Sequence, residues 1–265
     1  MLKLTQISIF GPVKTYLQDQ QNVINNKPSY EEKVNSAKNS WESKNRNHFQ
    51  SIRDTLDLIC CGARRCHYCE DSAADEVEHI WPKAFFPEKT FVWQNYLFSC
   101  GPCNGSHKKD KFAVFDQQGN QFDITRLRNL PVVPPTPGNP MFIDPAYDDP
   151  TDFITLDLTT GLFVPRFPIG TSEYKRAVYT LKTLGLNERD YLSKARRSAY
   201  AGYKDALVAY DNLKKNGGSA SQLKNKRNEI AEKHHPSVWN EMKVLARQQL
   251  AHGYFFNNYP ELYTI

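Results

Sequence analysis

Two Cys-x-x-Cys pairs, separated by 30 residues, constrain this chain more than any other feature of its sequence. The first pair is Cys66 and Cys69, and the second is Cys100 and Cys103. Each pair can place two sulfur atoms at two vertices of a tetrahedron, so the two pairs complete a four-sulfur Zn²⁺ shell with no position left for water. The spacing therefore predicts a structural zinc that stabilises a short, loop-rich segment unable to build a core of its own.

The rest of the sequence favours zinc over disulfide bonds at these cysteines. The first residues contain no apolar stretch followed by a small-residue cleavage site, and the apolar runs of the chain are too short to span a bilayer. We therefore expect a cytoplasmic protein that does not enter a membrane, where paired cysteines bind metals before they form disulfides. A redox Cys-x-x-Cys site is the alternative, although it would need only one pair. Cys60 and Cys61 are expected to be reduced thiols at a helix end.

Residue patterns along the 265-residue chain predict an α+β fold that is mostly α-helical. Ser29 and Glu32 form the capping box of a helix, and the prolines of PVVPPTPGNP favour an extended connector. The segment FITLDLTTGLFVP has the pattern of a β-hairpin. We divide the chain into an N-terminal arm with helices (1–61), a zinc-stapled core (62–130), a proline-rich connector with a hairpin (131–170) and a helical C-terminal region (171–265).

The segment between the two cysteine pairs carries the residues with chemical potential. Glu78 and His79 are adjacent, Asn95 lies five residues before the second pair, and Asn104 follows that pair directly. A histidine can take a proton from water near neutral pH. Carboxylate and amide oxygens can hold a hard divalent cation, which can stabilise charge on a phosphate. This combination indicates metal-assisted hydrolysis of a phosphodiester.

The combined pattern C-x₂-C … EHIWP … N … C-x₂-C-N-x₃-K, over about residues 62–112, resembles the zinc-stapled HNH endonucleases. The resemblance implies a ββα-metal core in which His79 is the general base and Glu78 binds a catalytic Mg²⁺ or Mn²⁺. It implies that Asn95 supports the loop that carries His79, and that Asn104 completes the metal site. His107 is the alternative to Asn104, and Glu78 stands where the commonest HNH pattern has Asp.

Longer segments carry a narrower resemblance. The stretch from YCEDSAADEVEHIWPK to SCGPCN, the motif IDPAYDDP and the run RAVYTLKTLGLNERDYLSKARRSAY resemble the PtuB-like HNH proteins of Septu-type and retron-associated anti-phage systems. This resemblance implies antiviral defence in bacteria, a PtuA-like ATPase partner within a higher-order complex, and a nucleic-acid target. It suggests that the C-terminal region docks the partner. DNA is the first candidate substrate, and structured RNA such as tRNA is the second, because both offer phosphodiesters.

Basic residues flank the cysteine pairs in a chain whose formal net charge is +5. They are Arg64, Arg65, Lys108, Lys109 and Lys111. Folding the two pairs together is expected to gather these side chains on one rim, where they would contact nucleic-acid phosphates. The alternative for the rim is a solvated loop face. The alternative for the whole chain is a non-catalytic zinc finger that binds nucleic acid or a partner without cutting it.

Overall fold

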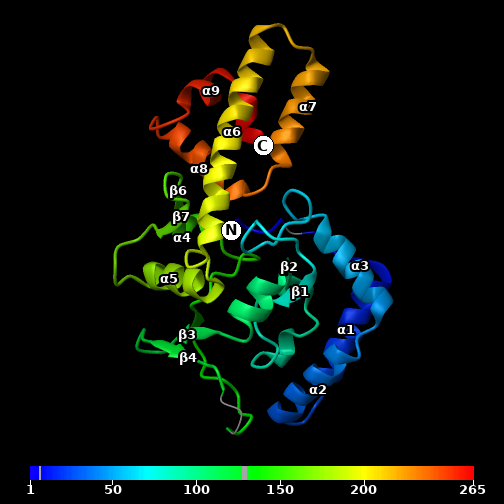
Figure 1. Ribbon diagram of the computed structural model, residues 1–265. Coiled ribbons are helices and arrows are strands. Elements are labelled where there is room, and N and C mark those ends of the chain that lie inside the picture. The colour runs from blue at the N-terminus through cyan, green and yellow to red at the C-terminus, as the bar shows by residue number, and fades with distance from the viewer. Residues whose placement is uncertain (6, 127–129) are drawn as a thin grey trace.

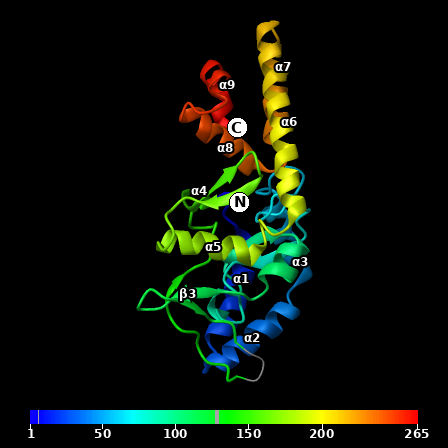
Figure 2. The same cartoon turned by 60° about the vertical axis from the view of Figure 1, so that its left-hand side comes forward.

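The computed structural model describes residues 1–5, 7–126 and 130–265 of the chain. The fold is α+β, with helices predominant and small antiparallel sheets between them. Helices α1 (Gly11–Asn25), α2 (Tyr30–Glu42) and α3 (Arg46–Asp57) lie along one side of the body. Helices α6 (Asp190–Lys215) and α7 (Ala220–Ala231) form a hairpin that projects from the opposite end (Figures 1 and 2). The predicted α+β class is confirmed, and about half of the chain is helical.

The N-terminal helices begin where their capping residues predict. The Ser29 side chain accepts a hydrogen bond from the Glu32 amide, and the Glu32 carboxylate accepts one from the Ser29 amide, which confirms the capping box at the start of α2. Asn45 caps α3 through its side-chain oxygen, which accepts from the amides of Asn47 and His48. The apolar faces of the three helices cover a buried cluster that includes Ile52 and Phe98.

Two short strands and a helical segment form the centre of the body. Strand β1 (Glu76–His79) pairs antiparallel with β2 (Tyr96–Ser99), so that Glu78 lies opposite Leu97. The connection between them contains the single turns η1 (Pro87–Lys89) and η2 (Trp93–Asn95). A wide helical segment, η3 (Pro102–Lys108), follows β2 and ends with a bond from the Lys109 amide to the Asn104 carbonyl, five residues earlier. Both cysteine pairs thus lie near the same end of the hairpin, where Glu76 is opposite Ser99.

The middle of the chain forms two further small sheets. Strands β3 (Ala113–Phe115), β4 (Gln121–Asp123) and β5 (Asn139–Pro140) make one sheet, in which β5 comes from the extended proline-rich connector. Residues 127–129, just before the boundary predicted at 130, lie outside the described residues. After the short helix α4 (Pro150–Phe153), strands β6 (Ile154–Asp157) and β7 (Leu162–Pro165) form the predicted hairpin.

The C-terminal region is helical, as predicted. Helix α5 (Ser172–Leu184) ends at Gly185, whose φ of +58° is the left-handed geometry that favours glycine. After α6 and α7 come α8 (Pro236–Arg247), α9 (Gly253–Asn258) and the final turn η4 (Pro260–Thr264). The aromatic C-terminal segment packs inward, with Phe256 and Leu262 fully buried. Within the described residues, no helix combines the length and the hydropathy needed to cross a membrane.

A large buried cluster connects the central segment to the C-terminal region. It includes the four paired cysteines, Phe142 of the connector and Trp239 of α8. This cluster crosses the boundaries predicted at residues 130 and 170, so these parts of the chain share one core.

Candidate functional site

The four paired cysteines meet in the protein interior. The Sγ atoms of Cys66, Cys69, Cys100 and Cys103 lie within 4.8 Å of one another, and all four residues are buried. The Sγ atoms of Cys69 and Cys100 are 3.8 Å apart. A tetrahedral shell with Zn–S bonds of about 2.3 Å has S···S edges of about 3.8 Å. The sulfur cluster therefore fits a zinc ion, and the predicted pairing of the two motifs is confirmed.

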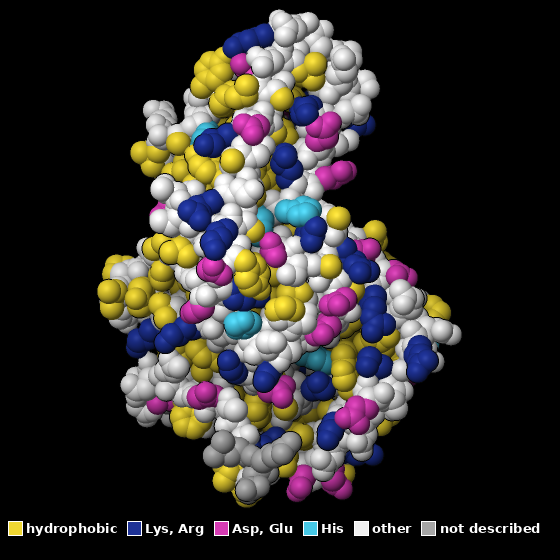
Figure 3. Space-filling model, viewed as in Figure 1, with side chains coloured by type: hydrophobic (Ala, Val, Ile, Leu, Met, Phe, Trp, Pro, Cys, Tyr) yellow, Lys and Arg dark blue, Asp and Glu magenta, His cyan; other side chains and the backbone are white. Residues whose placement is uncertain are grey.

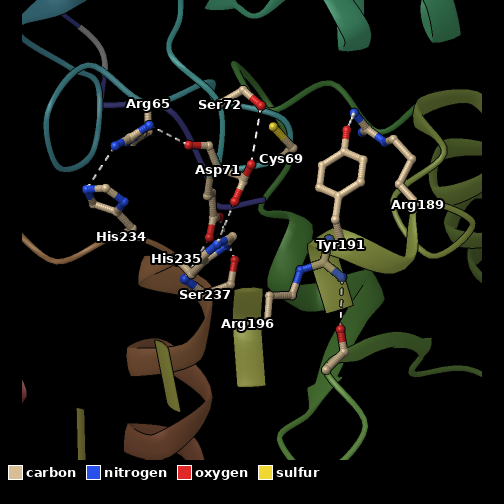
Figure 4. A network of polar contacts seen from close by, with 12 residues as sticks. Arg65, Cys69, Asp71, Ser72, Arg189, Tyr191, Arg196, His234, His235 and Ser237 are labelled. Atoms are coloured by element: carbon tan, nitrogen blue, oxygen red, sulfur yellow. Dashed lines mark hydrogen bonds and ion pairs between the residues drawn. The ribbon is translucent and has the colours of Figure 1, made fainter. Parts of the chain in front are cut away.

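Side chains from the C-terminal region surround this cluster. The Arg189 guanidinium donates to the Cys103 Sγ atom over 3.3 Å, a contact that would offset the negative charge of a thiolate. Arg65 donates to the Asp71 carbonyl and lies 3.3 Å from the Nε2 atom of His234 (Figure 4). The cluster thus lies at the junction between the central hairpin and the helices that follow it.

His79 is buried and held by a single backbone carbonyl. Its Nε2 atom lies 2.9 Å from the backbone carbonyl oxygen of Thr90. A carbonyl oxygen can only accept a hydrogen bond, so Nε2 carries the proton. The Nδ1 atom of the neutral ring therefore keeps its lone pair. Burial lowers the pKa of His79 well below its ordinary value, and the nearby cations of Lys83 and Lys108 lower it further. The ring is consequently a neutral base at physiological pH.

Asn95 closes the loop that follows His79. Its side-chain oxygen accepts from the Trp81 amide, and its Nδ2 donates to the carbonyls of Trp81 and Lys89. These bonds link the two ends of the segment between His79 and Thr90. The Thr90 carbonyl also accepts from the Tyr96 hydroxyl, over 2.6 Å. Asn95 is therefore placed where it can fix the position of the carbonyl that holds His79.

Glu78 forms a buried ion pair with Lys108. The Lys108 ammonium lies 2.5 Å from Oε1 of Glu78 and donates to the His79 carbonyl over 2.8 Å. Burial raises the pKa of Glu78, and the Lys108 charge opposes this effect. Lys108 is fully buried, so its ammonium does not lie on the surface where we expected a phosphate contact. Instead it compensates the carboxylate beside His79.

Asn104 reaches the same site from η3. Its Nδ2 donates to Oε2 of Glu76 over 2.7 Å, which leaves its side-chain oxygen available to another ligand. The ring of His107, the predicted alternative, packs against Gly185 at the end of α5. It lies so close that any side chain at position 185 would clash with it. Burial lowers the pKa of His107, and so does the neighbouring charge of Arg189. The structure thus brings Asn104, and not His107, toward Glu78 and His79.

Glu78, His79 and Asn104 line one pocket of about 160 Å³. Its walls also include Trp41, Lys83, Lys109 and Asp110. Lys109 is exposed at the rim, whereas Lys111 is exposed beyond it and lines a separate groove. Among the described residues, Arg64 and Arg65 do not line the pocket; the Arg64 guanidinium lies over the Phe98 ring. The predicted basic side chains therefore do not gather on one rim.

Three residues of the site escaped the sequence analysis. Trp41 of α2 packs edge to face on His79 with ring centroids 4.2 Å apart, and Lys83 lies over the Trp41 ring. No sequence signal connects Trp41 with a histidine so distant along the chain. Glu76 could have been found from strand alternation, because it lies two residues before Glu78 on the same face of β1.

The chain is similar to Septu protein PtuB. That protein comes from Bacillus mycoides (strain KBAB4), and the two sequences are 24% identical over 167 residues. The aligned region covers 57% of this chain and 51% of PtuB, so the chain spans about half the length of this relative. No protein-family model matches the chain. The similarity supports a relationship to the Septu proteins.

Proposed function

We propose that this chain is a metal-dependent HNH endonuclease that hydrolyses phosphodiester bonds in nucleic acid. The observation that carries the proposal is the neutral imidazole of His79, with Nε2 fixed by Thr90 and Nδ1 unprotonated in a pocket that also contains Glu78 and Asn104. The order of β1, β2 and η3 supports a ββα-metal core. The resemblance of the EHIWP and CN motifs to HNH enzymes supports the same assignment.

His79 would act as the general base. A general base must be unprotonated at the working pH in order to accept a proton, and the lowered pKa keeps His79 in that form. The Nδ1 atom of His79 would take a proton from a water molecule as that water attacks the phosphorus. Trp41 covers one side of the ring and limits its movement. Asn95 would maintain the Thr90 carbonyl that sets the tautomer.

Glu78 and Asn104 offer hard oxygen ligands for a divalent cation. Oε1 of Glu78 is paired with the Lys108 ammonium, which leaves Oε2 as the other donor atom of this carboxylate, and the Asn104 oxygen is free of the Glu76 contact. This donor set fits Mg²⁺ or Mn²⁺. When bound, such a cation would neutralise charge on the phosphate. Lys109 at the rim would bind a neighbouring phosphate.

We further propose that the chain is the effector of a bacterial anti-phage system. The similarity to Septu protein PtuB supports this, and the PtuB-like resemblance suggests that the chain works in the cytoplasm with a PtuA-like ATPase. Helices α6 and α7 of the C-terminal region project from the body as a hairpin, and this hairpin would provide the docking surface for the ATPase (Figure 2). The alignment covers only about half of PtuB, so the ATPase partner of this chain is part of the proposal.

Cleavage of plasmid DNA and of a total tRNA pool tests the nuclease assignment. We would compare the wild type with His79→Ala, Asn104→Ala and His107→Ala, each with EDTA, Mg²⁺ or Mn²⁺, alone and with any co-purifying ATPase. Metal-dependent cleavage should be lost in His79→Ala and Asn104→Ala and retained in His107→Ala. Full activity of His79→Ala would exclude its role as base. Tight binding without cleavage in every condition would favour the alternative, a non-catalytic zinc finger.

A further inference from the structure

A second hollow lies beside the proposed active site, between α5 and β4. Its volume is about 420 Å³. Three lysines and two tyrosines line it, namely Lys111, Lys175, Lys182, Tyr174 and Tyr179. Gln121, Val178 and Thr183 complete the lining. We call it the α5 groove. Figure 3 shows Lys and Arg side chains gathered in this region, below α5 and above the β3–β4 hairpin.

The lysines of the α5 groove lack anionic partners. None of the groove-lining residues is a carboxylate, and the ammonium groups of Lys111, Lys175 and Lys182 form no ion pair or hydrogen bond with a described residue. Lysines elsewhere on the surface do form such pairs, as Lys194 does with Asp190. Asp123 of β4 acts on the hydroxyl of Tyr179 and raises its pKa, but it does not line the groove. Three unpaired cations in one groove repel one another, and a polyanion would relieve that repulsion.

The α5 groove and the pocket that contains His79 are separate hollows, and residues 109–111 lead from one to the other. Lys109 lines the pocket, and Lys111 lines the groove two residues later, after a tight turn in which the Lys111 amide donates to the Lys108 carbonyl. The end of α5 lies directly against η3, where His107 fills the space beside Gly185. The two hollows are therefore connected by neighbouring residues of the chain and by the contact between η3 and the end of α5.

We propose that the α5 groove binds the sugar–phosphate backbone of the nucleic-acid substrate and leads it to the pocket, an inference that rests on the proposed nuclease function. Lys175 and Lys182 are seven residues apart on one helix, which places them on the same face about 10 Å apart. One DNA strand carries a phosphate every 3.4 Å or so of helix axis, so this distance spans about three phosphates. The contacts are with phosphates and therefore do not depend on base sequence.

Salt-dependent binding tests the α5 groove. We would measure the affinity of a fluorescent DNA duplex between about 50 and 200 mM salt, in a His79→Ala background that prevents cleavage. The groove variant is Lys175→Gln/Lys182→Gln. The control is Lys204→Gln/Lys224→Gln, which removes the same charge from exposed positions on α6 and α7. Circular dichroism and thermal unfolding would verify that both variants fold.

Each lost phosphate contact should reduce the slope of log affinity against log salt by about 0.9. The slope of the groove variant should therefore be smaller by about 2. Between the two salt concentrations, the fold-loss of affinity should be about ten times smaller for the groove variant than for the parent chain. The control should keep the parental slope. Equal slopes in the two variants would overturn the inference, and would direct attention to an acidic protein partner for the groove.

The outcome for the groove can be separated from the outcome for the nuclease. In chains that keep His79, the groove variant should cleave less than the control at physiological salt and regain cleavage at low salt. Cleavage by the wild type with equal slopes would retain the nuclease and reject the groove. A reduced slope with no cleavage in any chain would retain the groove as a nucleic-acid site and reject the nuclease.

Discussion

The Nδ2 atom of Asn104 lies 2.7 Å from Oε2 of Glu76. A carboxylate can only accept, so this contact fixes which end of the amide points toward Glu76 and which end faces away. Glu76 and Glu78 lie on one face of β1, and Asn104 comes from η3. The pair therefore joins the strand that carries His79 to the helical segment that supplies the second proposed ligand of the catalytic cation.

Glu76 is predicted to orient Asn104 for cation binding. Glu76→Ala should weaken Mn²⁺ binding about tenfold, the lower end of the effect expected when the partner of a metal ligand is removed. Glu76→Gln should restore much of the affinity, because its amide oxygen can still accept from Asn104. Calorimetric titration of Mn²⁺ measures this directly. Asp75→Asn, an exposed neighbour, controls for lost charge, and an equal loss of affinity there would exclude a specific role for Glu76.

His79 is predicted to remain neutral as the pH falls through 6.5, the ordinary value for histidine. Burial and nearby cations lower its pKa, and a lowered pKa means that the lone pair persists to a more acidic pH. Ring ¹⁵N resonances should therefore report a neutral ring protonated at Nε2, at a pH where half of the histidine in a model peptide is charged. Protonation of both ring nitrogens of His79 near pH 6.5 would contradict the proposed environment.

Asn95 is predicted to stabilise the loop between His79 and Thr90. Asn95→Ala leaves the Trp81 amide and two carbonyls without their partner, and a buried unsatisfied group costs about 1–3 kcal/mol. We expect a loss of about 3 kcal/mol in the free energy of unfolding, measured with urea. The rate of cleavage should fall more than the affinity for substrate. Gln94→Ala, at the exposed adjacent position, should change stability by less than about 0.5 kcal/mol.

Lys108 is predicted to be a structural counter-charge. Lys108→Met leaves the buried carboxylate of Glu78 unpaired, and breaking a buried ion pair in this way costs about 3 kcal/mol or more. Glu78→Gln/Lys108→Met should recover much of that stability, because neither charge remains. Lys109→Met removes the same charge from an exposed position and serves as the control. If both single variants unfold at the same urea concentration, the buried pair contributes little to stability.

Zinc is predicted to be required for folding. The purified protein should contain one zinc ion per chain, and Cys100→Ser should lose both the metal and the cooperative unfolding transition, because the cysteine cluster belongs to the large core. Cys60→Ser should keep its zinc. The Cys60 thiol lies outside the cluster, and burial raises its pKa to about 12, so it remains a protonated thiol. Metal analysis beside thermal unfolding measures both quantities, and a folded, zinc-free Cys100→Ser protein would contradict a structural role.

Local sequence signals predicted much of the fold. The capping box at Ser29 and the β-hairpin in FITLDLTTGLFVP depend on a few neighbouring residues, and each lies where it was predicted. The meeting of the four cysteines followed from the spacing of two motifs. Within the predicted N-terminal arm and helices (1–61), Asn45 begins a helix separate from the one that Ser29 caps.

The side-chain contacts around the site could not be predicted from local sequence signals. Lys108 was expected at the surface, but the ββ-helix arrangement turns its side chain inward onto Glu78. Arg65 was expected to face a phosphate, but it contacts His234, which lies 169 residues away along the chain. Such contacts depend on which distant segments pack together, and no local pattern encodes that.

The sequence by itself determined the residue types of the site, the cysteine framework and the succession of helices, because these depend on spacing and local geometry. Only the tertiary structure decided the tautomer of His79, the position of Asn104 beside Glu76, and the burial of Lys108. Each of these is fixed by a partner from another element: the Thr90 carbonyl, the Glu76 carboxylate and the Glu78 carboxylate. The physical reason is that a side chain's charge and orientation follow from its desolvation and its hydrogen-bond partners, which exist only after the chain has folded.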